Sequence, residues 1–165
     1  MAQQFGAAID MLEKVLVACP DELWRVRLGT IRNCPGPPSF GTLFITPSSG
    51  STCIYPGSVE GFMPPAPFTL DELDPAGIIP ESFSRDELQT YLAHGREKCR
   101  STLSGLTDEK AQQLCAFPWG ELTFAALLLD NMRHVQEHVA QLNMILGQKI
   151  GWSPGWITNA GETAV

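Results

Sequence analysis

The chain has 165 residues, of which 44% are hydrophobic and 18% charged, and this is the size and composition of a single globular domain. Its net charge is −7, and its eleven Lys and Arg residues are scattered, which argues against binding of nucleic acid or of anionic membranes. No apolar run reaches the ~18 residues of a membrane span, and the N-terminus lacks the pattern of a secretory signal. We therefore expect a cytoplasmic protein.

The first predicted element is an amphipathic helix over residues 3–19. Its apolar residues recur at steps of three and four and form one stripe, made of Phe5, Ala8, Ile9, Leu12, Leu16 and Cys19. Pro20 ends this helix, because proline cannot continue the hydrogen-bond ladder. Residues 21–24 then form a predicted polar turn, which is anchored by Trp24.

A long irregular segment follows at residues 25–56. It is rich in Pro, Gly, Ser and Thr and has no helical period, and only Thr42 to Ile45 has the pattern of a short strand. Such a segment is unusual inside a compact domain. Residues 57–83 form a proline-rich connection whose apolar residues indicate that it lies over a hydrophobic surface.

A second clear helix begins after Ser84, which forms a capping box with Glu87. Its predicted inner face consists of Leu88, Tyr91, Leu92, Cys99 and Leu103. Thr107 begins a short helical turn that we expect to run through Cys115.

The strongest predicted helix covers residues 123–146, with Thr123 as its N-cap and Gly147 as its terminator. Its apolar face consists of Phe124, Leu127, Leu128, Val135, Val139, Leu142 and Ile145. In the tail, 152–165, we expect Trp152 and Trp156 to pack back on the domain and the last residues to be loosely held.

The candidate chemical site is a pair of histidines on this last helix, His134 and His138. At 100° per residue they lie 40° apart on the inward-facing flank, so that two imidazoles from consecutive turns can bind one ion. Imidazole suits Zn, Ni or Fe, and Asn131 and Gln141 lie close enough to orient the rings. A complete metal site also needs a third ligand.

Other interpretations of these residues remain open. Two histidines can border a core without binding metal, and the string also matches the inverted zinc-protease motif H-x-x-E-H, although Glu137 projects away from the apolar stripe. The third histidine, His94, is predicted on the outer, solvated face of its helix. The five cysteines are widely spaced without a CxxC pair, which favours buried or idle thiols over disulfides or a zinc ribbon.

The sequence resembles the DinB-like proteins of the DinB/YfiT superfamily over roughly residues 3–24 and 57–150. The resemblance implies an all-α four-helix bundle that often dimerises. It also implies a divalent metal held by three histidines, with one on the second helix and an H-x3-H pair on the last. Some relatives are thiol-dependent transferases or metal-dependent hydrolase-like enzymes. The strings that carry the resemblance are DELW (21–24), GSVEGFMPPAPFTLDELDPAG (57–77), YLAHGREKCR (91–100), FPWGEL (117–122) and NMRHVQEHVAQLN (131–143).

His134 and His138 fall on the paired position, but the second-helix motif W-Y-x-x-Y-H-T-L-F-W-L-D-L-Y-L is missing. Permitted codons for residues 40–57, read two nucleotides out of frame, encode WYLVYHTLFWLDLYLSG. Our hypothesis is therefore a compensated frameshift, in the gene or in its sequencing, within 25–56. It predicts a degraded second helix, low stability and an incomplete metal site.

Two functions follow from the sequence. One is a metal-binding protein that acts on a small thiol or another small molecule. The resemblance implies that its reaction is that of a thiol-dependent transferase or of a metal-dependent hydrolase-like enzyme. The other is a non-catalytic bundle that acts through dimerisation or partner binding.

Overall fold

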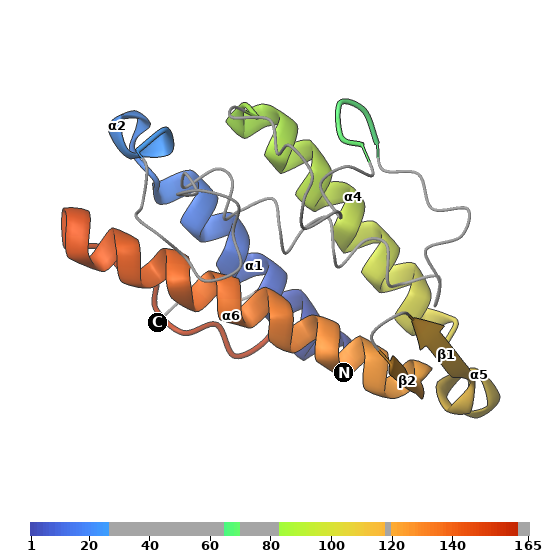
Figure 1. The fold of residues 1–165 in the computed structure, drawn as a ribbon. Helices are drawn as coiled ribbons and strands as arrows, with labels where there is room; N and C mark the ends of the chain where they lie inside the picture. The colour runs from blue at the N-terminus through green and yellow to red at the C-terminus, as the bar shows by residue number, and fades with distance from the viewer. Residues whose placement is uncertain (27–64, 70–82, 118–119, 162–165) are drawn as a thin grey trace.

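The computed structural model describes residues 1–26, 65–69, 83–117 and 120–161, and its architecture is all-α apart from one small hairpin. Three long helices dominate it: α1 (Ala2–Ala18), α4 (Arg85–Ser104) and α6 (Phe124–Ile150) (Figure 1). The predicted irregular segment 25–56, with its short strand, falls almost entirely outside the described residues, as does much of the connection 57–83. The predicted all-α class is confirmed.

Helix α1 is the central element, because it packs against both α4 and α6. Its predicted apolar stripe is buried, with Phe5, Ala8 and Leu16 fully withdrawn from solvent, and Val15 is buried beside it. The residues expected as a polar turn form the single helical turn α2 (Asp21–Trp24). Trp24 is buried there, and its Nε1 donates to the carbonyl of Phe83 at 3.0 Å.

Helix α4 begins as the sequence predicts. Ser84 Oγ accepts from the backbone N–H of Glu87 at 3.2 Å, and Glu87 Oε2 accepts from the N–H of Ser84 at 2.7 Å, which completes the capping box. Its inner face is buried except for Leu103, which is only partly covered. Phe68, from the connection, stacks on Phe83 and lies 4.3 Å from Tyr91 between ring centroids. This described part of the connection does lie over the hydrophobic core.

The region after α4 differs from the prediction. Helix α5 (Asp108–Gln112) begins at the expected cap, Thr107, but ends before Cys115. Cys115 instead belongs to strand β1 (Leu114–Phe117), which pairs antiparallel with β2 (Gly120–Thr123). A run of four residues is too short to reveal its period, which is why the helical interpretation of Cys115 was wrong.

Helix α6 starts at the predicted cap, where Thr123 Oγ1 accepts from the N–H of Ala126 at 3.3 Å. It passes through Gly147, the expected terminator, and ends at Gly151, whose φ of 65° is left-handed. Glycine weakens a helix only modestly, so Gly147 did not stop it. The predicted apolar face is buried apart from Ile145, which is partly covered, and Leu146 joins it.

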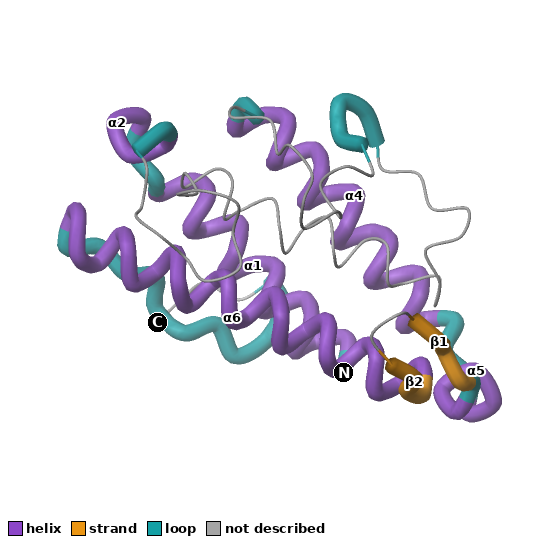
Figure 2. The backbone as a smooth tube through the Cα atoms, viewed as in Figure 1, coloured by secondary structure: helices purple, strands orange, loops and turns teal. Residues whose placement is uncertain are grey.

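The tail after α6 turns back and runs beside the bundle, drawn as the teal loop below α6 in Figure 2. Trp152 packs against the core as expected, whereas Trp156 is 63% exposed and Ile157 is the residue that becomes buried. The tail is tied to α1, because Ala160 N–H donates to the carbonyl of Gln3 at 3.2 Å. The described part of the tail is thus held by specific contacts, which the sequence did not predict.

Candidate functional site

The histidine pair lies in the middle of α6 and the structure brings its two rings together. The ring centroids of His134 and His138 are 4.8 Å apart, with 52° between their planes. This is the geometry expected for side chains one helical turn apart. The two residues differ in burial, because His134 is exposed while His138 is half-buried. The pair therefore lies at the border between the solvent-exposed face of α6 and its buried stripe.

His138 is the more unusual member of the pair. Its Nδ1 is buried and has no hydrogen-bond partner among the described residues. Burial lowers the pKa of His138, the neighbouring His134 adds to this effect, and together they bring the pKa to about 4. At neutral pH the ring is uncharged, which is the form in which imidazole binds a metal.

The two residues predicted to orient the histidines lie on the same helix. Asn131 is 1% exposed and sits one turn before His134, within the buried stripe. Gln141 follows His138 by three residues, and its Oε1 is buried without a hydrogen-bond partner in the described part of the chain. Buried polar atoms normally have hydrogen-bond partners. On the side of α6 that carries His138 and Gln141, the described residues therefore leave two buried polar atoms without a hydrogen bond.

The described residues supply no third ligand for the pair. Within residues 1–26, 65–69, 83–117 and 120–161, no group of three or more His, Cys, Asp or Glu side chains could hold a metal ion. The segment for which the resemblance implies a second-helix histidine lies outside the described residues. Glu137, the base in the H-x-x-E-H interpretation, is exposed as expected.

His94 is not the solvated residue that helical geometry predicted. It is only partly exposed, its Nε2 is buried without a hydrogen-bond partner among the described residues, and its ring lies 6.3 Å from that of Tyr91. Burial lowers the pKa of His94, and nearby Lys98 adds to the effect. The prediction of a solvated side chain was therefore wrong for His94.

The described cysteines Cys19, Cys99 and Cys115 are buried in the core, in agreement with the prediction of buried or idle thiols. Burial raises the pKa of Cys19 to about 11, with smaller effects from Arg85 and Asp21. A thiol with so high a pKa is not a nucleophile at neutral pH.

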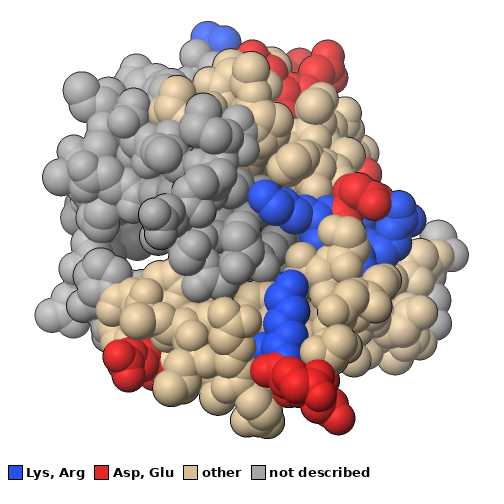
Figure 3. All heavy atoms as spheres, turned by 90° about the vertical axis from the view of Figure 1, so that its right-hand side faces the viewer, with Lys and Arg blue, Asp and Glu red and all other residues tan. Residues whose placement is uncertain are grey.

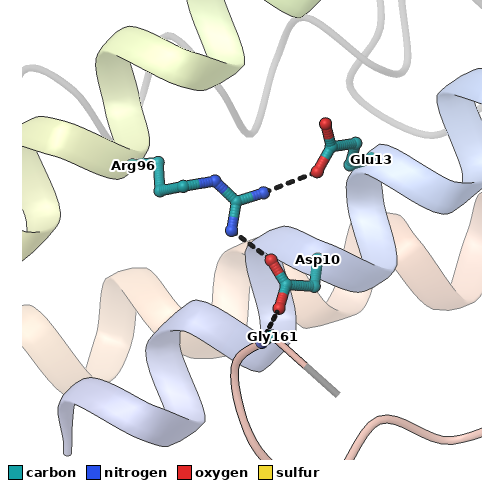
Figure 4. Close-up of polar contacts among 4 residues, drawn as sticks. All are labelled: Asp10, Glu13, Arg96 and Gly161. Carbon is teal, nitrogen blue, oxygen red and sulfur yellow. Dashed lines mark hydrogen bonds and ion pairs between the residues drawn. The ribbon is translucent and has the colours of Figure 1, made fainter. Parts of the chain in front are cut away.

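A polar cluster that the sequence did not single out joins three parts of the fold. Arg96 of α4 pairs with Asp10 of α1 and, at 2.7 Å, with Glu13 of the same helix (Figure 4). The second oxygen of Asp10 accepts from the backbone N–H of Gly161 at 2.7 Å. The sequence gives no signal of this cluster, because Arg96 lies 86 positions and Gly161 lies 151 positions after Asp10. This cluster fastens the tail to the bundle.

The charged side chains give no sign of a nucleic-acid surface. On the face shown in Figure 3, the Lys and Arg side chains of the described residues adjoin Asp and Glu side chains. Several are in ion pairs within one helix, such as Arg100 with Glu97 and Arg133 with Asp130. Of the helices in the described residues, none combines the length and the hydropathy needed to cross a membrane.

The sequence profile of the DinB superfamily matches residues 4–142, which is most of the chain. Neither the curated proteins nor the solved structures contain a significant match.

Proposed function

The chain belongs to the DinB superfamily, and from this premise we propose that it is a divalent-metal-binding protein whose ion is held by His134 and His138. The observation that carries the proposal is the pairing of the two rings, 4.8 Å apart between centroids. The neutral state of His138 and its buried Nδ1 support it, because metal ligands must be deprotonated.

The residues fit part of a metal site. Two imidazoles are ligands for Ni, Zn or Fe, and in the resemblance described above a histidine of the second helix completes the set. A divalent ion bound with open positions would polarise a carbonyl or lower the pKa of a bound thiol. We propose a small thiol or another small molecule as substrate, and a thiol-dependent transferase or hydrolase-like reaction.

In this chain Gln141 is proposed to orient the pair. Its Oε1 is buried and without a partner among the described residues, and it follows His138 by three positions on the same helix. An acceptor at this place can receive an imidazole N–H and fix which ring nitrogen is free. Asn131, buried one turn before His134, is proposed for the same role.

A second candidate is a non-catalytic bundle that acts by homodimerisation or partner binding. It is favoured by one observation, which is that the described residues supply no three-ligand group. In either case we propose a cytoplasmic location, which the wide spacing of the cysteines, without a CxxC pair, supports.

Metal analysis of the purified protein separates the two candidates. The chain is incubated with Ni, Zn or Fe(II), desalted, and its bound metal is measured by mass spectrometry. We expect near-stoichiometric metal in the native chain and its loss in His134→Ala. His94→Ala is the matched control, because it removes a histidine outside the pair and should keep the metal. No bound metal in the native chain, or equal loss in both variants, would contradict the metal-binding proposal.

A further inference from the structure

The outward face of α6 carries apolar side chains where an amphipathic helix normally carries polar ones. At 100° per residue, Leu129, Arg133, Ala140 and Met144 lie within about 60° of one another, opposite the buried stripe. Each of them is exposed, and Leu129 and Met144 keep 46% and 58% of their surface open to solvent. Apolar side chains that gather on a surface mark an interaction site.

The tail widens this face beside Ala140. Trp156, which is 63% exposed, lines one hollow together with Ala140 and Asn143, so its indole lies next to the outward row of α6. The tail is held in this place because Ile157 is buried in the core. Trp and Met are enriched at protein interfaces, and here Trp156 and Met144 both neighbour Ala140. Together they form an apolar anchor at one end of the face.

The middle of the face carries one charge of each sign. Arg133 and Glu137 are one helical turn apart and exposed, with 79% of the Arg133 side chain open to solvent. Arg133 Nη1 lies 3.3 Å from Oδ1 of Asp130, and an exposed pair of this kind contributes little. Two copies of a chain with net charge −7 repel one another unless their contact is locally balanced, and Arg133 beside a carboxylate gives that balance.

The order of these residues along α6 is self-complementary. The midpoint between Leu129 and Met144 falls just before Glu137, and the midpoint between Arg133 and Ala140 falls at the same point. A two-fold axis there, with antiparallel helices, brings Leu129 of each copy beside Met144 of the other. The same axis brings Arg133 of each copy within one helical turn of Glu137 of the other.

We propose that this face joins two copies of the chain in an antiparallel, two-fold symmetric contact between their α6 helices. The inference rests on the homodimer of the second candidate function and names its surface, and it does not depend on a metal at the histidine pair. The stretch from Leu129 to Met144 is ~22 Å long, which places the contact at the small end of specific interfaces. We therefore expect a Kd of about 1 to 100 µM.

Two charge variants test the contact across the axis. Arg133→Glu leaves only carboxylates around the axis, and Glu137→Arg leaves only guanidinium groups, so each variant alone should dimerise about tenfold or more weakly than the native chain. A mixture of the two variants should form a heterodimer with a Kd within about threefold of the native value, because each copy supplies the charge that the other lacks. Sedimentation equilibrium over a concentration range that brackets the native Kd measures this. EDTA is present throughout, so that metal bound by the histidines plays no part.

Leu129→Glu tests the apolar end of the face. It places a carboxylate against Met144 of the other copy and should weaken the dimer by about tenfold or more. Leu114→Glu is the matched control, because it makes the same change at a leucine of β1 that is 69% exposed and lies away from this face. The control should keep the native Kd. Near-ultraviolet circular dichroism checks that each variant is folded.

Each way in which the proposal can fail has its own result. A native dimer that persists in Leu129→Glu and in both charge variants would overturn this face and leave the homodimer standing. A native dimer whose two charge variants stay monomeric when mixed would overturn the pairing of Arg133 with Glu137 across the axis. A native chain that is monomeric over the whole range would overturn both the face and the homodimer, while the metal-binding proposal would still be decided by its own metal analysis.

Discussion

Two polar regions of the fold differ in how many of their buried polar atoms have hydrogen-bond partners among the described residues. Around Asp10, each carboxylate oxygen has a partner, one being Arg96 of α4 and the other the N–H of Gly161 (Figure 4). On the histidine side of α6, Nδ1 of His138 and Oε1 of Gln141 are buried without partners among the described residues. The first region joins α1, α4 and the tail. In the second region, hydrogen-bond partners for two buried atoms are not found among the described residues.

The Asp10 cluster is formed by residues that all lie outside the segment 25–56. α1, α4 and the tail supply one another's partners there. The resemblance implies that a histidine of the second helix completes the histidine side. The frameshift hypothesis places that histidine within 25–56, so restoring this segment tests whether it supplies a partner for His138.

The largest effect is expected from restoring the second helix. Replacing residues 40–57 by the displaced-frame sequence WYLVYHTLFWLDLYLSG adds an amphipathic helix with a histidine, which buries apolar area and supplies a third imidazole. The native chain should melt below about 65 °C, and the restored chain should melt higher by roughly 10 °C. Calorimetry measures both.

A scrambled segment of the same composition is the control for this replacement. It should give no increase in melting temperature and no tighter binding of Zn or Ni. Equal melting of the restored and scrambled chains would contradict the hypothesis, and so would a gene whose codons cannot encode the motif in the displaced frame.

The Asp10 cluster offers the next largest effect. Asp10→Ala leaves Arg96 with one partner and the N–H of Gly161 with none, so we expect the free energy of unfolding to fall by about 2 kcal/mol. Glu13→Ala is the matched control, because its side chain is 50% exposed against 14% for Asp10 and should cost less than ~0.5 kcal/mol. Urea denaturation measures the difference, and equal losses would mean that Asp10 is not the fastening residue.

Acid should weaken the histidine side selectively. The pKa of His138 is lowered from the model-compound value of 6.5 to about 4, so the unfolded chain binds a proton at pH values where the folded chain does not. The stability from His138 is therefore present above pH 6.5 and is lost as the pH falls toward 4. Between pH 7 and pH 5 we expect a loss of about 1 to 2 kcal/mol in the metal-free chain.

Variants isolate this contribution from the carboxylates, which also titrate in acid. His138→Gln should flatten the dependence of the free energy of unfolding on pH between 7 and 5. Under the same conditions His94→Gln should keep the part of the pH dependence that comes from His138. It should lose only the smaller part that comes from the lowered pKa of His94. An unchanged slope in His138→Gln would show that its ring is not withdrawn from solvent.

The sequence predicted the elements whose signals are local and missed those that depend on distant residues. The stripe of α1, the Ser84–Glu87 box and the Thr123 cap were correct because each is set by residues a few positions apart. The hairpin at Cys115 was missed because its strands have four residues each. The histidine pair was found from its spacing and its two rings do lie together, but its metal-binding role stays a prediction.

The tail contacts were beyond sequence reasoning for a different reason. Gly161 and Asp10 are 151 positions apart, and no period connects them. The burial of His94 Nε2 was also not predicted, because a helical angle gives the direction of a side chain and not what packs beside it. Burial at the edge of a stripe is decided by what packs beside the helix.

The smallest effect comes from a close approach between α1 and the tail. A Cβ added at Gly6 would lie 2.5 Å from Cβ of Ala160, which is closer than atoms can pack, so the tail must shift. At Gly147 of α6 the nearest atom would be 3.8 Å away, an ordinary contact. Alanine favours a helix over glycine by about 0.5 to 1 kcal/mol at either place. Gly147→Ala should therefore raise the free energy of unfolding by that amount, whereas Gly6→Ala should lower it by about 1 kcal/mol. Equal stabilisation of both variants in urea would show that the tail does not hold against α1.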